Sequence, residues 1–230
     1  MAPISRTHRR RVRVAFQAVL PGERLDERPF SSWPGNPCPG GTMSKLLFAA
    51  FNEGAKLSMT GDHEAAISFF DKVLAVDAKH FPALIAKGSS LAQLGRAQDA
   101  LRCFERAIEV DPSAADPHRD AALCQLELGE PEAAAELMER AIQLNGDPGY
   151  REASAIEVYE RGNALLTRGP RRPDKARYRQ ARHTFELALE LAPAYVEAAK
   201  ALADVWEHLG DTAQRDQYTK LASRLRPKGV

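Results

Sequence analysis

The sequence has little of what builds a disulfide-linked, zinc-binding or membrane-spanning protein. It contains three cysteines, too few for a disulfide framework or a four-cysteine zinc site. No apolar run approaches the roughly 18 residues that would suggest a membrane-spanning helix. The formal net charge is only +1, so no global field favours nucleic acid or an anionic membrane. These absences indicate a cytoplasmic protein of a reducing compartment, in which Cys103 and Cys124 are small buried residues of helices.

Motifs of catalysis are also missing from the sequence. It has no phosphate-binding loop, no HExxH motif and no serine nucleophile elbow. The six histidines are scattered, and no two are spaced four residues apart as helical metal ligands often are. The sequence therefore predicts a protein that is not an enzyme, with no catalytic residue, no metal site and no cofactor.

Residues 1–42 differ in composition from the rest of the chain. They carry seven arginines, three acids and six prolines, no lysine, and no sustained helical or strand period. We interpret them as a disordered N-terminal extension, or as sequence upstream of a working start at Met43. An organellar presequence is the alternative, because the stretch up to Leu20 is rich in arginine and free of acids. Without this extension, residues 43–230 carry a net charge of −3.

Residues 43–230 contain an internal repeat of 34 residues that starts at Leu47. Small residues recur at positions 8 and 20, glycine at position 15 and a large apolar residue at position 24. In the first three copies these residues are Gly54, Gly88 and Ala122; Ala66, Ala100 and Ala134; Gly61, Gly95 and Gly129; and Phe70, Phe104 and Met138.

Each recurring residue has a mechanical reason in a pair of helices. Glycine at position 15 supplies the left-handed backbone that ends the first helix. Small residues at positions 8 and 20 let the two helices approach closely. The large residue at position 24 is expected to fill the gap to the neighbouring pair. Since one pair cannot bury both of its apolar faces, several pairs must stack.

The repeat resembles the tetratricopeptide repeat family over residues 47–230. The resemblance implies an all-α fold, a right-handed superhelical solenoid of antiparallel helix pairs with an open concave face. About five repeats are expected, the last of them degenerate, because Arg215 and Thr219 replace its marks at positions 20 and 24. The expected repeats span about 47–80, 81–114, 115–148, 155–195 and 196–230.

The fourth repeat departs from the pattern in two places. Six additional residues before Ala155 predict a longer first helix. Seven further residues lie between Gly169 and Ala181, in the arginine-rich segment 170–180. We interpret this segment as an N-terminal lengthening of the second helix, starting near Asp174 after Pro173. A contact with an acidic protein is the alternative.

In the tetratricopeptide repeat family the first helix of each pair lines the concave face, mainly at positions 2, 5, 6, 9, 12 and 13. The resemblance therefore implies an apolar surface near the N-terminus, with Met59 among its residues, and an acidic one further on, with Glu160 and Glu207. The residues predicted to contact a partner are Phe48, Phe51, Asn52, Ile85, Ser89, Arg119, Asp120, Leu123, Tyr159, Asn163, Lys200 and Asp204.

A clamp for a chaperone's C-terminal carboxylate is one mechanism of this family, and the sequence does not carry it. Its five positions hold Phe51, Ala55, Ala86, Asp116 and Asp120, and the two acids would repel a carboxylate.

The function expected from this resemblance is that of a non-catalytic adaptor or scaffold. It would bind a peptide or helix of another protein in its concave groove, by apolar anchors and some basic residues of the partner. Nucleic acid is not expected as a partner. The alternatives are a self-associating structural scaffold and an accessory subunit of a separate enzyme.

Overall fold

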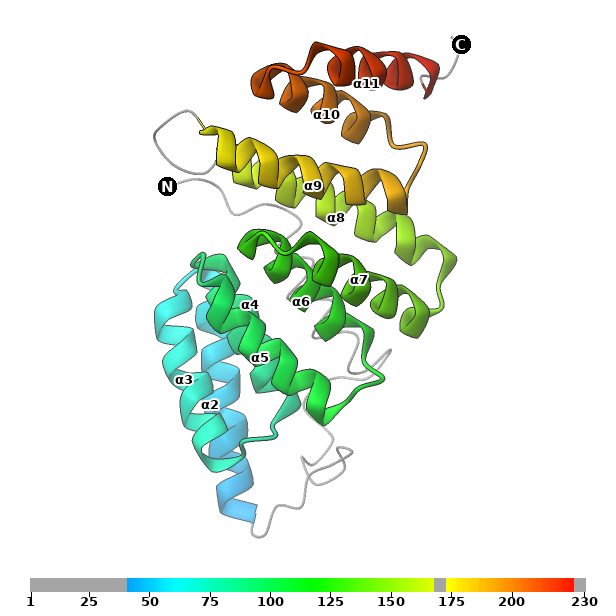
Figure 1. Cartoon of the computed structure of the whole chain (residues 1–230). Coiled ribbons are helices and arrows are strands. Elements are labelled where there is room, and N and C mark those ends of the chain that lie inside the picture. Colours follow the sequence, from blue (N-terminus) through cyan, green and yellow to red (C-terminus); the bar gives the residue numbers. More distant parts are fainter. Residues whose placement is uncertain (1–40, 168–172, 226–230) are drawn as a thin grey trace. The chain divides into compact units, whose positions relative to one another are not determined.

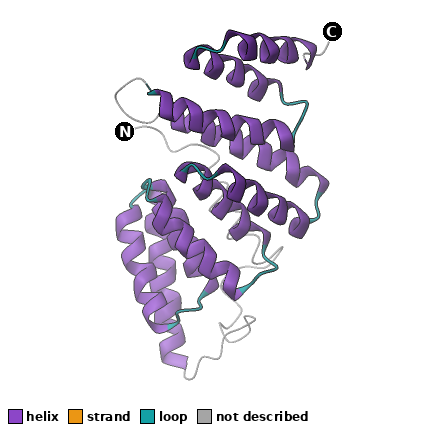
Figure 2. Ribbon diagram, in the orientation of Figure 1, coloured by secondary structure: helices purple, strands orange, loops and turns teal. Residues whose placement is uncertain are grey.

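The computed structural model describes residues 41–167 and 173–225, and every regular element in these ranges is a helix (Figures 1 and 2). The chain divides into two compact units, one ending at Val110 and the other beginning at Asp111. The predicted extension 1–42 lies outside the described residues, apart from Gly41 and Thr42 at the start of the first helix. No helix of the described ranges is long and apolar enough to cross a bilayer.

Unit 1 consists of two helix pairs. Helices α2 (Gly41–Thr60) and α3 (His63–Val76) pack against each other, as do α4 (Phe81–Gln93) and α5 (Ala97–Val110). Helix α3 also packs on α4, so the second pair stacks on the first (Figure 1). Side chains of α2, α3, α4 and α5 share one core.

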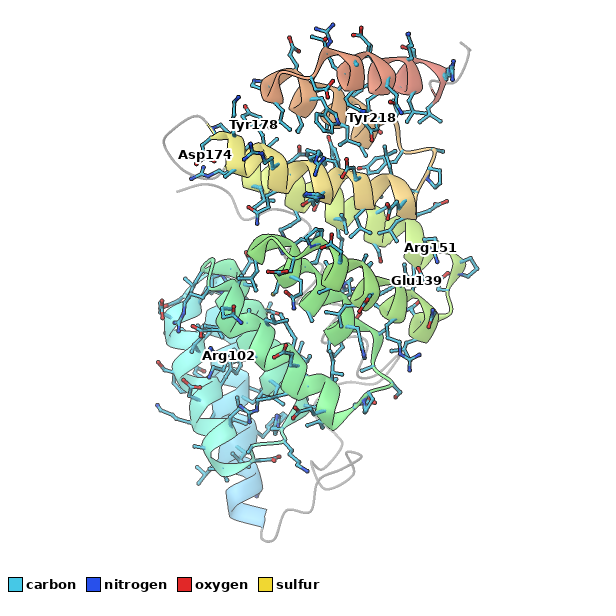
Figure 3. All side chains as sticks on the ribbon, viewed as in Figure 1. Arg102, Glu139, Arg151, Asp174, Tyr178 and Tyr218 are labelled. Atoms are coloured by element: carbon cyan, nitrogen blue, oxygen red, sulfur yellow. The ribbon has the colours of Figure 1, made fainter. Side chains whose placement is uncertain are left out.

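Unit 2 adds three pairs of the same kind, in which α6 packs on α7, α8 on α9 and α10 on α11. The pairs are joined through α7 to α8 and through α9 to α10. An ion pair of 2.9 Å between Glu139 and Arg151 spans the joint between α7 and α8 (Figure 3). The six helices are α6 (Ala115–Leu128), α7 (Pro131–Asn145), α8 (Pro148–Thr167), α9 (Lys175–Leu191), α10 (Val196–Leu209) and α11 (Thr212–Leu225).

The predicted all-α architecture of paired helices is confirmed, and so are both departures of the fourth repeat. Its first helix, α8, has 20 residues where α6 has 14. Its second helix begins at Lys175, and the side chain of Asp174 caps it by accepting a hydrogen bond from the backbone N–H of Arg177. Residues 168–172 of the arginine-rich segment lie outside the described residues.

Glycines end the first helices, as the repeat predicts. The four described glycines at position 15 have φ angles between 77° and 91°, in the left-handed region that side chains disfavour. They are Gly61, Gly95, Gly129 and Gly210. The backbone N–H of Gly129, for example, binds the carbonyl of Leu126 in the last turn of α6.

The aromatic residue at position 24 packs on the small residue at position 8 of its own pair. A Cβ atom added to Gly88 would lie 2.7 Å from the ring of Phe104, and one added to Gly162 would lie 2.5 Å from that of Phe185. Gly54 and Phe70 repeat the arrangement at 2.8 Å. The sequence predicts that these rings fill the gap to the next pair; in these three pairs they also occupy the space that the glycine opens within the pair.

Candidate protein-binding surface

The first helices of unit 1, α2 and α4, lie side by side and expose several apolar side chains. Ser58 and Ser90 hydrogen-bond at 3.2 Å between the two helices, which fixes their register. Met59 is 57% exposed and Phe48 is 38% exposed. These two residues are eleven positions apart, about three helical turns, and therefore lie on one stripe of α2. Ile85 and Ser89 of α4 and Asn52 of α2 are half-buried.

The ring of Phe51 packs mainly in the core of unit 1 and contributes less to its surface. Its ring lies 5.9 Å from that of Phe70 and 5.6 Å from the imidazole of His80, and it packs on the cluster around Leu84. Much of this ring is thus covered by other side chains of unit 1. Phe48 and Met59 are the better candidates for contact with a partner.

Arg119 of unit 2 holds the first helices α6 and α8 together. Its guanidinium lies 3.0 Å from Asp116, 3.1 Å from Asp120 and 3.2 Å from Glu157 of α8. Burial by itself would lower the pKa of Arg119, but the carboxylates of Asp120, Glu157 and Asp116 raise it above its ordinary value. The sequence predicts Arg119 and Asp120 as contacts of a partner; in the structure they pair with each other, and Asp116 and Glu157 share the same guanidinium.

A second ion pair joins the same helices further along. Arg161 of α8 pairs with Glu127 of α6, and both side chains are largely buried. Tyr159 packs between Phe185 and Tyr195, with ring centroids 5.5 and 5.1 Å away, and reaches the core shared with α10. Within unit 2, α8 therefore contacts α6 through these ion pairs and shares a core with α10.

Leu123 belongs to the core of unit 2, since it is 2% exposed. Its side chain has no surface with which to contact a partner, and we leave it out of the proposed site. The 3.6-residue helical period places Leu123 near the boundary between core and surface, so its spacing alone could not separate the two.

The surface that remains on α8 and α10 is mainly acidic. The predicted residue Asn163 is half-buried, whereas Lys200 and Asp204 are exposed. Ile156 of α8 is 48% exposed and is the large apolar side chain of this surface. The exposed acidic side chains of this surface are Glu160, Glu197, Asp204 and Glu207. Lys200 is the exposed cation among the predicted contacts of α8 and α10.

No group of three metal-ligating side chains occurs within the described ranges. Cys103 and Cys124 are buried, and burial raises the pKa of the Cys103 thiol, which disfavours the reactive thiolate.

Residues 85–148 match the family model of the tetratricopeptide repeat. The matched residues run from α4 to α7. Together with the paired helices and the glycine–aromatic packing, this match supports a tetratricopeptide-repeat protein. No curated protein matches the sequence.

Solved tetratricopeptide-repeat structures share the fold at low sequence identity. A crystal structure of MamA is 21% identical, with a TM-score of 0.55, covering 80% of this chain and 93% of MamA. YrrB, a tetratricopeptide-repeat protein with an unusual peptide-binding site, is 19% identical, with a TM-score of 0.51, covering 79% of this chain and 87% of YrrB.

Repeats of this family are generally protein-interaction modules without catalytic activity.

Two surfaces of the first helices are candidates for such an interaction. The unit 1 first-helix face consists of Phe48, Asn52, Met59, Ile85 and Ser89 on α2 and α4. The unit 2 first-helix face consists of Ile156, Glu160, Asn163, Glu197, Lys200, Asp204 and Glu207 on α8 and α10. The sequence prediction gave Met59 only as one member of a wider set of positions and did not single out Ile156. Their exposure depends on which neighbours pack around them, which one sequence does not show.

Proposed function

We propose that this protein is a non-catalytic cytoplasmic adaptor that binds a peptide or helix of another protein on its first-helix faces. The observation that supports this most directly is the exposure of Met59, Phe48 and Ile156 at positions that face partners in this family. Isolated exposed apolar side chains are common on any protein. Phe48 and Met59 differ from such isolated side chains, because both lie on one stripe of α2.

Each face favours its own kind of partner residue, apolar anchors on unit 1 and basic side chains on unit 2. The unit 1 first-helix face offers apolar contacts, which supply most of the free energy of binding in protein interfaces. The unit 2 first-helix face adds Glu160, Asp204 and Glu207, which attract basic side chains and steer their approach. The aspartates Asp116 and Asp120 lie around Arg119, and neither position supplies the cation that the carboxylate clamp requires.

A peptide-display selection on the full-length chain tests this function. We expect enriched peptides to combine aliphatic or aromatic residues with lysine or arginine. Met59→Glu should weaken peptides selected on the unit 1 first-helix face, and Ile156→Glu those selected on the unit 2 first-helix face, by tenfold or more, because each variant places a charge in an apolar contact.

Val76→Glu is the matched control, since Val76 is 54% exposed at the end of a second helix, α3. It should leave the affinity of the peptides unchanged. Failure to enrich any peptide, or equal losses for Val76→Glu and Met59→Glu, would contradict the adaptor. Light scattering on the same samples separates the alternative, because a self-associating scaffold would grow with concentration and lose that growth in Met59→Glu.

A further inference from the structure

The seven-residue insertion of the fourth repeat builds a feature that the other repeats lack. Helix α9 has 17 residues, whereas α3, α5 and α11 have 14 and α7 has 15. Its additional N-terminal turn lies against the turn between α6 and α7. Gln180 fixes this contact, because its side-chain amide donates to the carbonyls of Leu126 and Glu127, at 3.0 and 2.6 Å. These carbonyls belong to the last turn of α6, where helical partners run out.

A half-open cleft of about 330 Å³ lies between the two elements. Leu128 and Pro131 line it from the side of α6 and α7. Helix α9 contributes Ala176, Arg179, Gln180 and His183, whose spacing of three and four residues places them on one helical face. The cleft thus combines apolar walls with a cationic side.

Arg179 differs from the other arginines around it. Arg182 lies over the ring of Trp206, at 5.1 Å, and 3.9 Å from Glu186. Arg177 also has an interaction partner. Arg179 is exposed at the cleft and forms no ion pair or hydrogen bond with any described residue. The acids next to the lining residues on the α6–α7 side are Glu127, which pairs with Arg161, and the exposed Glu130 and Glu132; none of them lines the cleft.

We propose that this cleft is a second binding site, which takes an acidic side chain flanked by aliphatic residues from a partner protein. A guanidinium binds a carboxylate through two parallel hydrogen bonds, and Arg179 has its donors available for this. Leu128, Pro131 and Ala176 supply apolar contact for the flanking residues. The site is separate from both first-helix faces, so it does not depend on the function proposed above.

Nucleic acid fits the cleft less well than an acidic peptide. Single-stranded nucleic acid needs aromatic side chains on which bases stack, and no aromatic ring lines the cleft other than the imidazole of His183. Tyr178, at the N-terminal end of α9 near Asp174, stacks on His208 of α10 at 4.5 Å instead (Figure 3).

The test uses the full-length protein and two labelled peptides, Gly-Glu-Leu-Asp-Leu-Glu-Gly and its amide counterpart Gly-Gln-Leu-Asn-Leu-Gln-Gly. Fluorescence anisotropy should show that the acidic peptide binds at least tenfold more tightly than the amide peptide. Arg179→Gln should remove at least tenfold of that affinity, as expected for a charge-assisted hydrogen bond.

Arg140→Gln is the matched control, because Arg140 is an exposed arginine of α7 outside the cleft. It should leave binding unchanged, and so should Met59→Glu, which separates this site from the first-helix faces. Absence of binding at millimolar peptide, equal affinity for the two peptides, or equal losses in Arg140→Gln and Arg179→Gln would overturn the proposal. Tight binding of inorganic phosphate without binding of the acidic peptide would also overturn it, in favour of a simple anion site.

Discussion

The two units use the same repeat in different ways. In unit 1 the first helices meet through neutral contacts, the hydrogen bond between Ser58 and Ser90 and the aromatic contact of Phe51 with His80. In unit 2 the corresponding helices α6 and α8 meet through the ion pairs of Arg119 and Arg161. The packing of an aromatic ring on a glycine recurs in both units, in the pairs α2–α3 and α4–α5 of unit 1 and in α8–α9 of unit 2. The helix pair is therefore the constant part, and the joints and surfaces between pairs vary.

This difference bears on what each surface offers to a partner. Neutral joints leave the unit 1 first-helix face apolar, with Met59 and Phe48 exposed. In unit 2, Arg119 and Arg161 are already paired with carboxylates between α6 and α8. Their positive charges therefore do not neutralise the exposed acids of α8 and α10. Buried ion pairs contribute little net stability but fix geometry, since breaking one leaves an uncompensated charge.

The largest effect is expected where the two units are alike. Phe104→Ala in unit 1 and Phe185→Ala in unit 2 should each cost about 3–5 kcal/mol of stability, because both rings are fully buried against a glycine. Chemical denaturation followed by circular dichroism measures this. Phe48→Ala, at a partly exposed ring, should cost far less, and a similar loss there would show that the glycine–aromatic contact is not special.

Breaking the ionic joint should destabilise unit 2 selectively. Arg119→Ala should cost about 3 kcal/mol, because it leaves the carboxylates of Asp120 and Glu157 close together without their cation. Hydrogen exchange should then show faster opening of α6 and α8, while α2 to α5 remain protected. The double variant Arg119→Ala/Glu157→Gln should recover part of the loss, and no recovery would refute the role of charge.

Acid should weaken unit 1 through His80. Burial lowers the pKa of His80 below its ordinary value, while Asp77 and a backbone hydrogen bond oppose this. Nδ1 of the neutral ring caps α4 by accepting from the backbone N–H of Ala83 at 3.2 Å. Since the unfolded chain binds the proton more readily, stability should be complete above about pH 6.5 and should fall below it, until the pH passes the folded pKa.

The variant His80→Asn checks this, because asparagine also caps helices but does not titrate. It should flatten part of the pH dependence of unit 1 unfolding between pH 5 and 7. The remaining slope would come from His63, whose pKa burial also lowers. An unchanged slope in His80→Asn would contradict the assignment.

The sequence was a good guide to the fold, because glycine, alanine and phenylalanine at fixed spacing have few structural alternatives. Gly88 and Phe104 could be paired by counting residues, and the start of α9 at Lys175 followed from Asp174 and Pro173. It was a poorer guide to the candidate site. The position of Arg119 in the repeat predicts a surface residue, but its side chain pairs with Glu157, 38 positions further along the chain. Helical periodicity does not predict such a contact between two helices.

The cleft beside Arg179 illustrates the same limit. The insertion was visible as a break in the 34-residue period, but its contact with α6 depends on Gln180, whose side chain reaches carbonyls more than 50 positions earlier in the chain. No sequence spacing pointed to that hydrogen bond. A departure from the repeat indicates which segment of the chain differs from the other copies. The contacts that this segment forms are visible only in the folded structure.

The adaptor function is tested most directly by methyl-labelled NMR of the full-length protein, titrated with a peptide from the display selection. The account predicts that the methyl signals of one first-helix face, Met59 and Ile85 of unit 1 or Ile156 of unit 2, shift with the peptide while that of Val76 stays in place. Shifts confined to Val76 or to Leu128, with Met59 and Ile156 unchanged, would contradict binding on the first-helix faces.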